Sequence, residues 1–166
     1  MPDLLLEIGA EEIPAGFLPG AITQLKEASE KLLEESGLAL GEVKSYASPR
    51  RLVLTVRGLA ERQPDRIEEV SGPPSRIAFD DQGNPTRAAL GFARTSGVSV
   101  DQLIKLETPK GEYLGVRLEK KGKETKVILK TLLPELIKAL HFPKTMKWGD
   151  NDFRFVRPVH WVLAIL

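Results

Sequence analysis

The chain has 166 residues, of which 42% are hydrophobic and 28% charged, and its formal net charge is +1. This composition is ordinary for a globular protein of one or two small domains, and it means that any surface attracting nucleic acid must be local. The absence of cysteine excludes disulfides, thiol catalysis and zinc–thiolate sites, and only two histidines remain for any other metal site.

The first sixty residues predict one helix and three strands. Residues 4–8 form a short apolar run typical of a buried strand, and 17–35 carry apolar residues at helical spacing up to Ser36-Gly37. Residues 42–47 and 52–59 predict two further strands, the second with one buried face. The order strand, helix, strand, strand predicts an α+β fold with a mixed or antiparallel sheet and helices on one face.

The middle of the chain, 64–118, differs in composition and is a candidate inserted lobe. Two extended pieces, 67–70 and 76–79, flank Gly72-Pro73-Pro74, and a turn is expected at 80–83, where Asp80 and Asp81 lack the further ligands of a calcium loop. Asn84-Pro85 begins a short helix over 86–94, and the capping-box pattern at 99–102 begins another. The two short helices predict a helical hairpin within the lobe.

The last third predicts a strand over 112–119, a helix over 124–140 and a buried strand over 159–166. Pro134 interrupts the helix at a cost of about 3 kcal/mol, so a kink or a restart is expected near Leu133. The chain stops inside an apolar run without a polar tail, which indicates a fragment of a longer protein. Nothing resembles a signal peptide, and no apolar run approaches the roughly 20 residues needed to span a bilayer.

Residues 142–161 combine five of the ten aromatic residues with prolines and a turn at 148–152. Aromatic anchors holding a rigid loop would present its cations to RNA phosphates or to an acidic partner. The plainer interpretation places the aromatics in the core and the cations in solvent. Arg50 and Arg51 follow a Pro-containing turn, and pairing with carboxylates of the first loop is at least as favoured as RNA contact. The candidate binding residues are Arg50, Arg51, Lys144, Lys147, Arg154 and Arg157.

No motif for catalysis is present in the sequence. There is no phosphate-binding glycine loop and no serine in a nucleophile turn. Glu7, Glu11 and Glu12 are the only carboxylate cluster near the end of an apolar strand, and they would serve acid–base chemistry only if buried. We therefore predict no catalytic residue, no metal site and no cofactor within this chain.

Five segments in order resemble the N-terminal region of the bacterial glycyl-tRNA synthetase beta subunit. They are EIGAEEIPAGFL near the start, SPRRLVL at 48–54, GPP with AFDDQGNPTRAALGFAR, KGEYL at 110–114, and FPKTMKW with FVRPVHW. The resemblance implies a cytoplasmic alpha2beta2 ligase whose alpha subunit activates glycine with ATP and Mg²⁺, while the beta subunit supplies tRNA recognition. It also implies a fold similar to the B3/B4-type domain, which by itself does not establish a function.

Three hypotheses follow from the resemblance and the residues together. The leading one is a non-catalytic α+β module, covering 1–166, that helps to hold tRNA-Gly and to dock the alpha subunit. The second is a purely structural docking module whose cations pair internally. The third is a hydrolytic editing domain using Glu7, Glu11 or Glu12, which is least favoured because a tight pocket for glycine excludes larger amino acids sterically.

Overall fold

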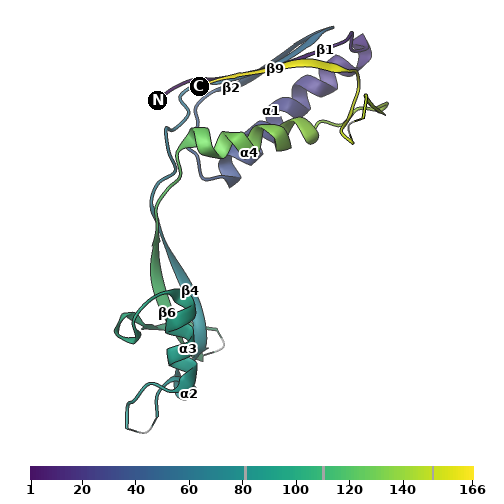
Figure 1. Cartoon of the computed structure of the whole chain (residues 1–166). Helices are drawn as coiled ribbons and strands as arrows, with labels where there is room; N and C mark the ends of the chain where they lie inside the picture. Colours follow the sequence, from purple (N-terminus) through teal and green to yellow (C-terminus); the bar gives the residue numbers. More distant parts are fainter. Residues whose placement is uncertain (81, 110, 151) are drawn as a thin grey trace. The chain divides into compact units, whose positions relative to one another are not determined.

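The computed structural model describes residues 1–80, 82–109, 111–150 and 152–166. The chain divides into two compact units (Figure 1). The first unit comprises Met1–Pro64 and Gly122–Leu166, and the second unit comprises Asp65–Lys121. Asp81, Lys110 and Asn151, which belong to the turns and the KGEYL segment discussed above, lie outside the described residues.

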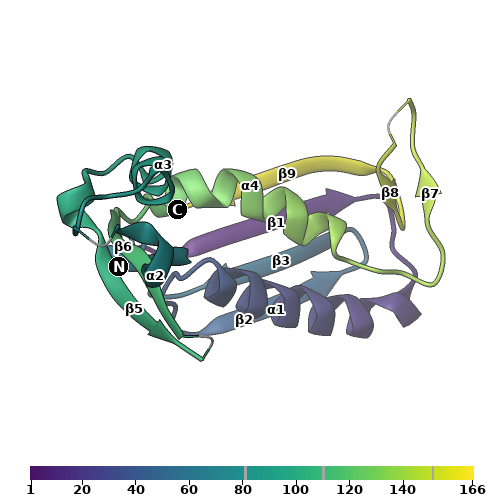
Figure 2. The same cartoon turned by 90° about the horizontal axis from the view of Figure 1, so that it is seen from below.

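The first unit is an antiparallel sheet with two helices on one face. Its strands follow the order β2-β3-β1-β9. They are β1 (Leu4–Ala10), β2 (Val43–Ser48), β3 (Arg51–Val56) and β9 (Val159–Ile165). Helices α1 (Leu18–Glu35), which follows the 3-10 turn η1 (Ala15–Phe17), and α4 (Thr125–Lys138) run across the same face of this sheet (Figure 2). The predicted α+β class, with helices on one face, is confirmed.

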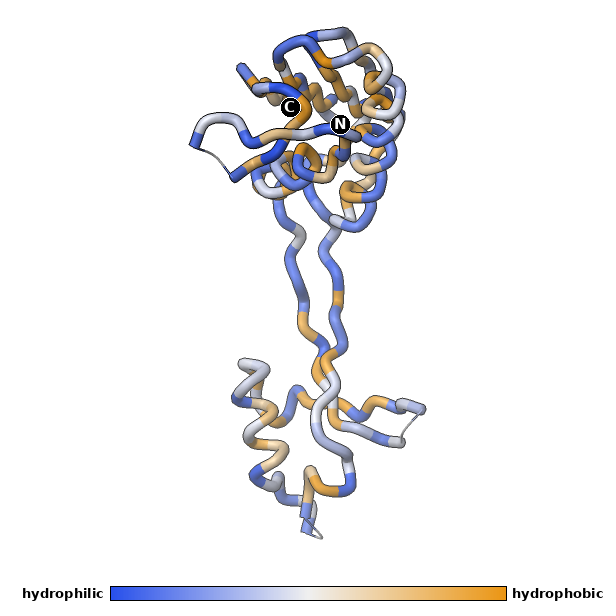
Figure 3. The backbone as a smooth tube through the Cα atoms, turned by 90° about the vertical axis from the view of Figure 1, so that its right-hand side faces the viewer, coloured by the Kyte–Doolittle hydropathy of each residue, from blue (hydrophilic) through white to orange (hydrophobic). Residues whose placement is uncertain are grey.

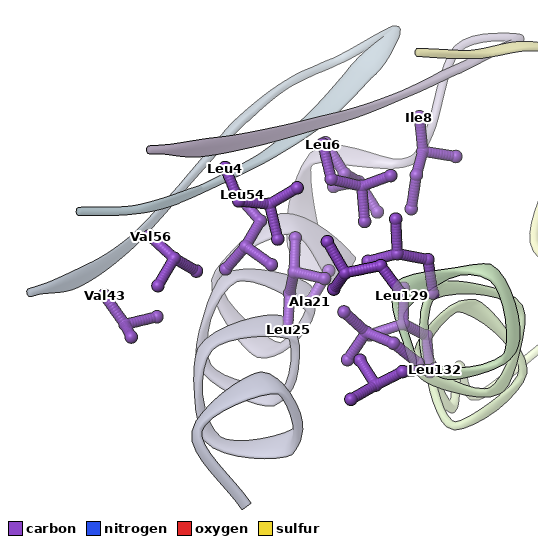
Figure 4. Packing of buried hydrophobic residues seen from close by; sticks show 14 of the residues in the cluster. Leu4, Leu6, Ile8, Ala21, Leu25, Val43, Leu54, Val56, Leu129 and Leu132 are labelled. Carbon is purple, nitrogen blue, oxygen red and sulfur yellow. The ribbon is translucent and has the colours of Figure 1, made fainter. Parts of the chain in front are cut away.

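Strand alternation builds the core of the first unit. Every second residue of β1 and β3 points toward the helices, and each of these side chains is at most 2% exposed: Leu4, Leu6, Ile8, Leu52, Leu54 and Val56. They meet Leu25 of α1 and Leu129 of α4 in one cluster (Figure 4). Burying one such leucine contributes about 1.5–3 kcal/mol, so this cluster is the main source of stability for the unit.

Helix α4 passes through Pro134 and continues to Lys138, so the restart considered near Leu133 does not occur. A proline inside a helix removes one backbone hydrogen bond. The buried face of α4 offsets that loss, because its leucines on both sides of the proline pack into the core: Leu129, Leu132, Leu133 and Leu136.

The second unit is a three-stranded antiparallel sheet of order β4-β6-β5, with short helices. The strands are β4 (Arg66–Pro74), β5 (Ile104–Thr108) and β6 (Gly111–Lys120), and the helical elements are α2 (Ser75–Ala78), α3 (Arg87–Ser96) and the 3-10 turn η2 (Val100–Gln102). Among the described residues, its buried cluster contains Ala78, Ala89 and Leu114, and the partly buried Phe79, Phe92 and Leu103 pack against it. The part of the β4–β6 ribbon where the start of β4 pairs with the end of β6 is mostly hydrophilic (Figure 3).

Two predictions for the second unit are wrong. Residues 76–79 were expected to be extended, but Ser75–Ala78 is a helical turn whose Ala78 packs against Ala89 and Leu114. The helical hairpin is absent from the described part of the unit, since α3 is followed by one 3-10 turn and then by β5. The capping box between Ser99 and Gln102 is confirmed, but pairing of β5 with β6 ends the helix after one turn.

The prediction for 159–166 is right about the strand and wrong about its burial. Val159–Ile165 pairs with β1 as an edge strand, and its residues from His160 onward are exposed. An apolar run indicates that a strand is buried, but it does not identify the segment that covers the strand.

Candidate functional site

Three candidate cations, Lys144, Lys147 and Arg154, lie on or beside a small hairpin anchored by aromatic side chains. Strands β7 (Met146–Lys147) and β8 (Arg154–Phe155) pair antiparallel. Phe155 is 1% exposed, and its ring meets Phe142 edge-on at 5.2 Å and Phe153 stacked at 5.6 Å between centroids. The indole Nε1 of Trp148 donates to the backbone oxygen of Phe155 at 3.1 Å. The hairpin is therefore fastened to the core by its aromatic residues.

Each cation of the hairpin has a different environment. Lys147 Nζ pairs with Asp152 Oδ1 at 2.6 Å, and Arg154 donates from NH2 to the backbone oxygen of Thr145 at 3.0 Å. Lys144 is exposed, and within the described ranges it has no hydrogen bond or ion pair. Lys144 is consequently the candidate cation most available to an external anion.

A second group of cations surrounds the end of β1, where the chain enters its first loop. Glu11 contacts the side chains of Arg50 and His160: its Oε2 lies 3.5 Å from NH2 of Arg50, and its Oε1 lies 2.6 Å from Nε2 of His160. Arg157 Nε donates to the backbone oxygen of Glu12 at 3.0 Å. These contacts join the β2–β3 turn, the β1 end and the β9 start. The β7–β8 hairpin lies at the same end of the sheet (Figure 2).

The third contact set lies on the sheet face that carries no helix. Glu7 Oε1 accepts from Arg51 Nε at 3.2 Å and from the indole Nε1 of Trp161 at 2.9 Å. The Arg51 guanidinium lies 5.9 Å from the Trp161 ring centroid, within range of a cation–π contact. The ring covers Gly9 so closely that a Cβ there would lie 2.0 Å from a Trp161 carbon. The glycine of the EIGAEE segment thus makes room for this tryptophan.

The structure therefore places both arginines of SPRR against carboxylates, and their contact with RNA stays a prediction. Arg50 meets Glu11 and Arg51 meets Glu7. Because the arginine side chain is more than half exposed in both pairs, each pair contributes at most about 1 kcal/mol. Their larger effect is to fix the positions of the guanidinium groups at the sheet end.

The three glutamates serve as acceptors in this network. The Glu7 carboxylate pairs with Arg51, and the Glu11 carboxylate contacts His160. The backbone oxygen of Glu12 accepts a hydrogen bond from Arg157. In the part of the chain that the structure describes, no group of three or more carboxylates and histidines could hold a metal ion. A cavity of about 510 Å³ in the second unit is lined by Pro74, Ser75, Arg76, Lys105, Gly111, Glu112 and Tyr113.

Sequence reasoning missed three participants. His160 contacts the carboxylate of Glu11, the backbone oxygen of Thr145 accepts a hydrogen bond from Arg154, and Gly9 lies beneath the ring of Trp161. Positions 11 and 160 are 149 residues apart, so no local pattern links them. Only the pairing of β1 with β9 brings the two together.

None of the helices formed by described residues is long and apolar enough to cross a membrane. The structure thus defines an α+β protein with an arginine–carboxylate network at one end of its antiparallel sheet.

The model of the family described as glycyl-tRNA synthetase beta subunit matches residues 4–166. The chain is 50% identical over 166 residues to the glycine–tRNA ligase beta subunit of Magnetococcus marinus, covering 100% of this chain and 24% of that protein. It is 47% identical over 163 residues to the subunit of Syntrophus aciditrophicus and 49% identical to that of Desulforudis audaxviator, in each case covering 98% of this chain and 24% of the relative.

The chain belongs to the glycyl-tRNA synthetase beta subunit family, as the sequence resemblance predicted. It spans about a quarter of the length of the curated relatives that it matches. The expected likeness to the B3/B4-type domain stays a prediction.

Proposed function

We propose that this chain is the N-terminal module of the beta subunit of an alpha2beta2 glycine–tRNA ligase, acting in the cytoplasm. In this proposal the module supports binding of tRNA-Gly and association with the alpha subunit. Adenylate formation and glycyl transfer, which use ATP and Mg²⁺, take place on the alpha subunit. The second unit, Asp65–Lys121, is the inserted lobe of the module.

The observation that carries the tRNA part is the anchored β7–β8 hairpin. Its aromatic residues hold the backbone, so the cations are presented at little further cost in conformational entropy. Lys144 has no internal partner among the described residues, and the ion pair of Lys147 with the 99% exposed side chain of Asp152 is readily exchanged for a phosphate. Contacts of this kind neutralise phosphates and weaken steeply with salt.

The test uses the full-length beta subunit with Lys144→Glu and Lys147→Glu together. Binding of tRNA-Gly is measured over a range of salt concentrations, with Lys31→Glu and Lys126→Glu as a control that changes net charge equally at exposed lysines on α1 and α4. We expect weaker binding and a shallower salt dependence, by roughly one unit of slope per lost phosphate contact, only for the hairpin variant. If the affinity for tRNA-Gly and its salt dependence are unchanged, neither lysine lies in the interface.

Docking of the alpha subunit without RNA contact is the second candidate function. It is favoured by the internal partners of the other cations, since Arg50, Arg51 and Arg157 are all engaged with the end of β1. Under this alternative the hairpin variant retains tRNA affinity and loses association with the alpha subunit, measured by sedimentation of the mixed subunits.

The editing hypothesis retains one supporting contact, the carboxylate–histidine pair of Glu11 and His160 at 2.6 Å. Such a pair can orient an imidazole as a general base. Arg50 also occupies Glu11, which favours a structural role. Editing requires that the beta subunit alone deacylates mischarged tRNA-Gly, and that His160→Ala abolishes this activity.

A further inference from the structure

Strand β9 is apolar yet exposed along almost its whole length. From Trp161 to Leu166 it carries no charged residue. Val162 is 51% exposed, Leu163 43% and Ile165 52%. A contiguous apolar strand of this kind at a sheet edge marks a surface that another segment covers.

The exposure affects both faces of β9. The register sets Trp161 beside Gly9, Leu163 beside Glu7 and Ile165 beside Leu5, on the face without helices. Val162 pairs with Ile8 and Ala164 with Leu6, whose side chains are buried beneath the helices, yet Val162 and Ala164 remain exposed. A strand apolar on both faces is typical of the interior of a sheet covered on both sides.

The opposite edge of the same sheet provides an internal comparison. Strand β2, with the sequence VKSYAS, alternates in burial and carries Lys44 and two serines. Lysine and polar residues of this kind protect a natural edge from pairing with other strands. The sheet therefore has one edge built to face solvent and one edge built as an interior strand.

A strand is the occupant that fits β9, because its outer side presents the alternating N–H and C=O groups of an unpaired ladder. Matched relatives extend well beyond this region, since the chain covers only 24% of their length. A segment of the same polypeptide is held near β9 at millimolar effective concentration, which a separate chain does not reach at cellular levels.

We propose that, in the full-length beta subunit, a strand from the part of the subunit outside residues 1–166 pairs with the free edge of β9. The four-stranded sheet then becomes larger, and the segments joined to the new strand cover Val162, Leu163 and Ile165. This inference rests on family membership and on the exposure of β9, and it is independent of the proposed tRNA role.

Hydrogen exchange of the full-length beta subunit, read at single amides, tests the pairing. In an edge strand only alternate amides of β9 bond to β1, and the intervening ones exchange rapidly. We expect protection at every amide from Trp161 to Ile165, with the outward amides slowed by more than about 100-fold relative to unprotected amides. Strand β2 is the control, since its amides should keep the alternating pattern of an edge. Alternating exchange in β9 overturns the proposal.

Photo-crosslinking identifies the occupant. p-Benzoylphenylalanine replaces Val162 in the full-length beta subunit, with the same probe at Lys44 of β2 as the control, and the linked peptides are identified by mass spectrometry. We expect links from position 162 to a segment of the same chain outside residues 1–166, in the isolated subunit and in the complex with the alpha subunit. Links to a second beta chain or to the alpha subunit, or no link above the Lys44 control, overturn it.

Discussion

The two units of the chain reach stability by different means. The first buries large aliphatic side chains from β1 and β3 beneath two helices, whereas the fully buried cluster of the second consists of two alanines and Leu114. The second unit depends correspondingly more on its strand ladder and on local hydrogen bonds, such as those that Asp80 accepts from Gln82 and Asn84. A small lobe that buries few large side chains depends on its turns and strand ladder, while the larger unit depends on its core.

The units share one device, a glycine beneath an aromatic ring. In the first unit Trp161 covers Gly9, and in the second Phe92 covers Gly72, where a Cβ would lie 2.6 Å from a ring carbon. Trp161 is also held by its hydrogen bond to Glu7. A glycine-to-alanine substitution therefore meets a hydrogen-bonded ring in the first unit, at Gly9, and the ring of Phe92 in the second, at Gly72.

The largest expected effect comes from truncating one buried leucine in each unit. Leu54 is 0% exposed and Leu114 is 1% exposed. We expect Leu54→Ala to lower the free energy of unfolding by about 3–5 kcal/mol, because the packed core around it cannot collapse into the cavity. Leu114→Ala should cost only about 2 kcal/mol, since the small cluster has less structure to hold a void open.

Urea unfolding measures both costs, and hydrogen exchange shows which unit loses protection. The loss in Leu114→Ala should be confined to Asp65–Lys121. Equal costs for the two variants would contradict the contrast between the cores.

A medium effect is expected from adding one methyl group to each glycine. Gly9→Ala should destabilise the chain by about 1–3 kcal/mol, because the Trp161 ring must move away and lose its bond to Glu7. Gly72→Ala should cost less, because Phe92 can shift without breaking a hydrogen bond. The measurement is a double-mutant cycle, with Trp161→Ala and Phe92→Ala as the partner changes.

In the Trp161→Ala background, Gly9→Ala should become nearly neutral. A cost that persists in that background would show that the ring is not what excludes a side chain at position 9.

The smallest effect is local and depends on pH. The backbone N–H of Asn84, followed by its side-chain amide, holds the pKa of the Asp80 carboxyl below its usual value. A lowered folded-state pKa means that the stabilising contribution is present above the unfolded value and is lost as pH falls through the folded one. The 80–84 turn should therefore loosen only at strongly acidic pH.

The readout is the amide resonance of Asn84 in an NMR titration of Asp80. Its midpoint should lie below the ordinary aspartate value of about 3.9, and Asp80→Ala should remove the transition. A midpoint at or above the ordinary value would show that the turn does not favour the charged carboxylate.

Much of the local structure could be predicted because its signals are local. The alternation at 52–56, the helical spacing after Leu18 and the capping box at Ser99 each correspond to the observed element. The sequence does not show which residues of the aromatic cluster are buried. Phe155 is buried and Trp148 packs beside it, as the plainer interpretation held, but Trp161 lies on the open sheet face. Spacing alone does not distinguish these environments, because all three are aromatic residues beside cations.

By itself, the sequence identified the family through the resemblance of its five segments. It also determined the α+β class and the positions of most helices and strands, because periodicity, glycine, proline and capping residues act within a few positions. Only the tertiary structure decided that Arg50 meets Glu11, that Arg51 meets Glu7, and that His160 joins them. It also decided that the apolar run at 159–166 lies at an edge. These outcomes depend on strand order and register, which bring together residues that are distant in the sequence, up to 149 positions apart for Glu11 and His160, and no local propensity encodes such pairings.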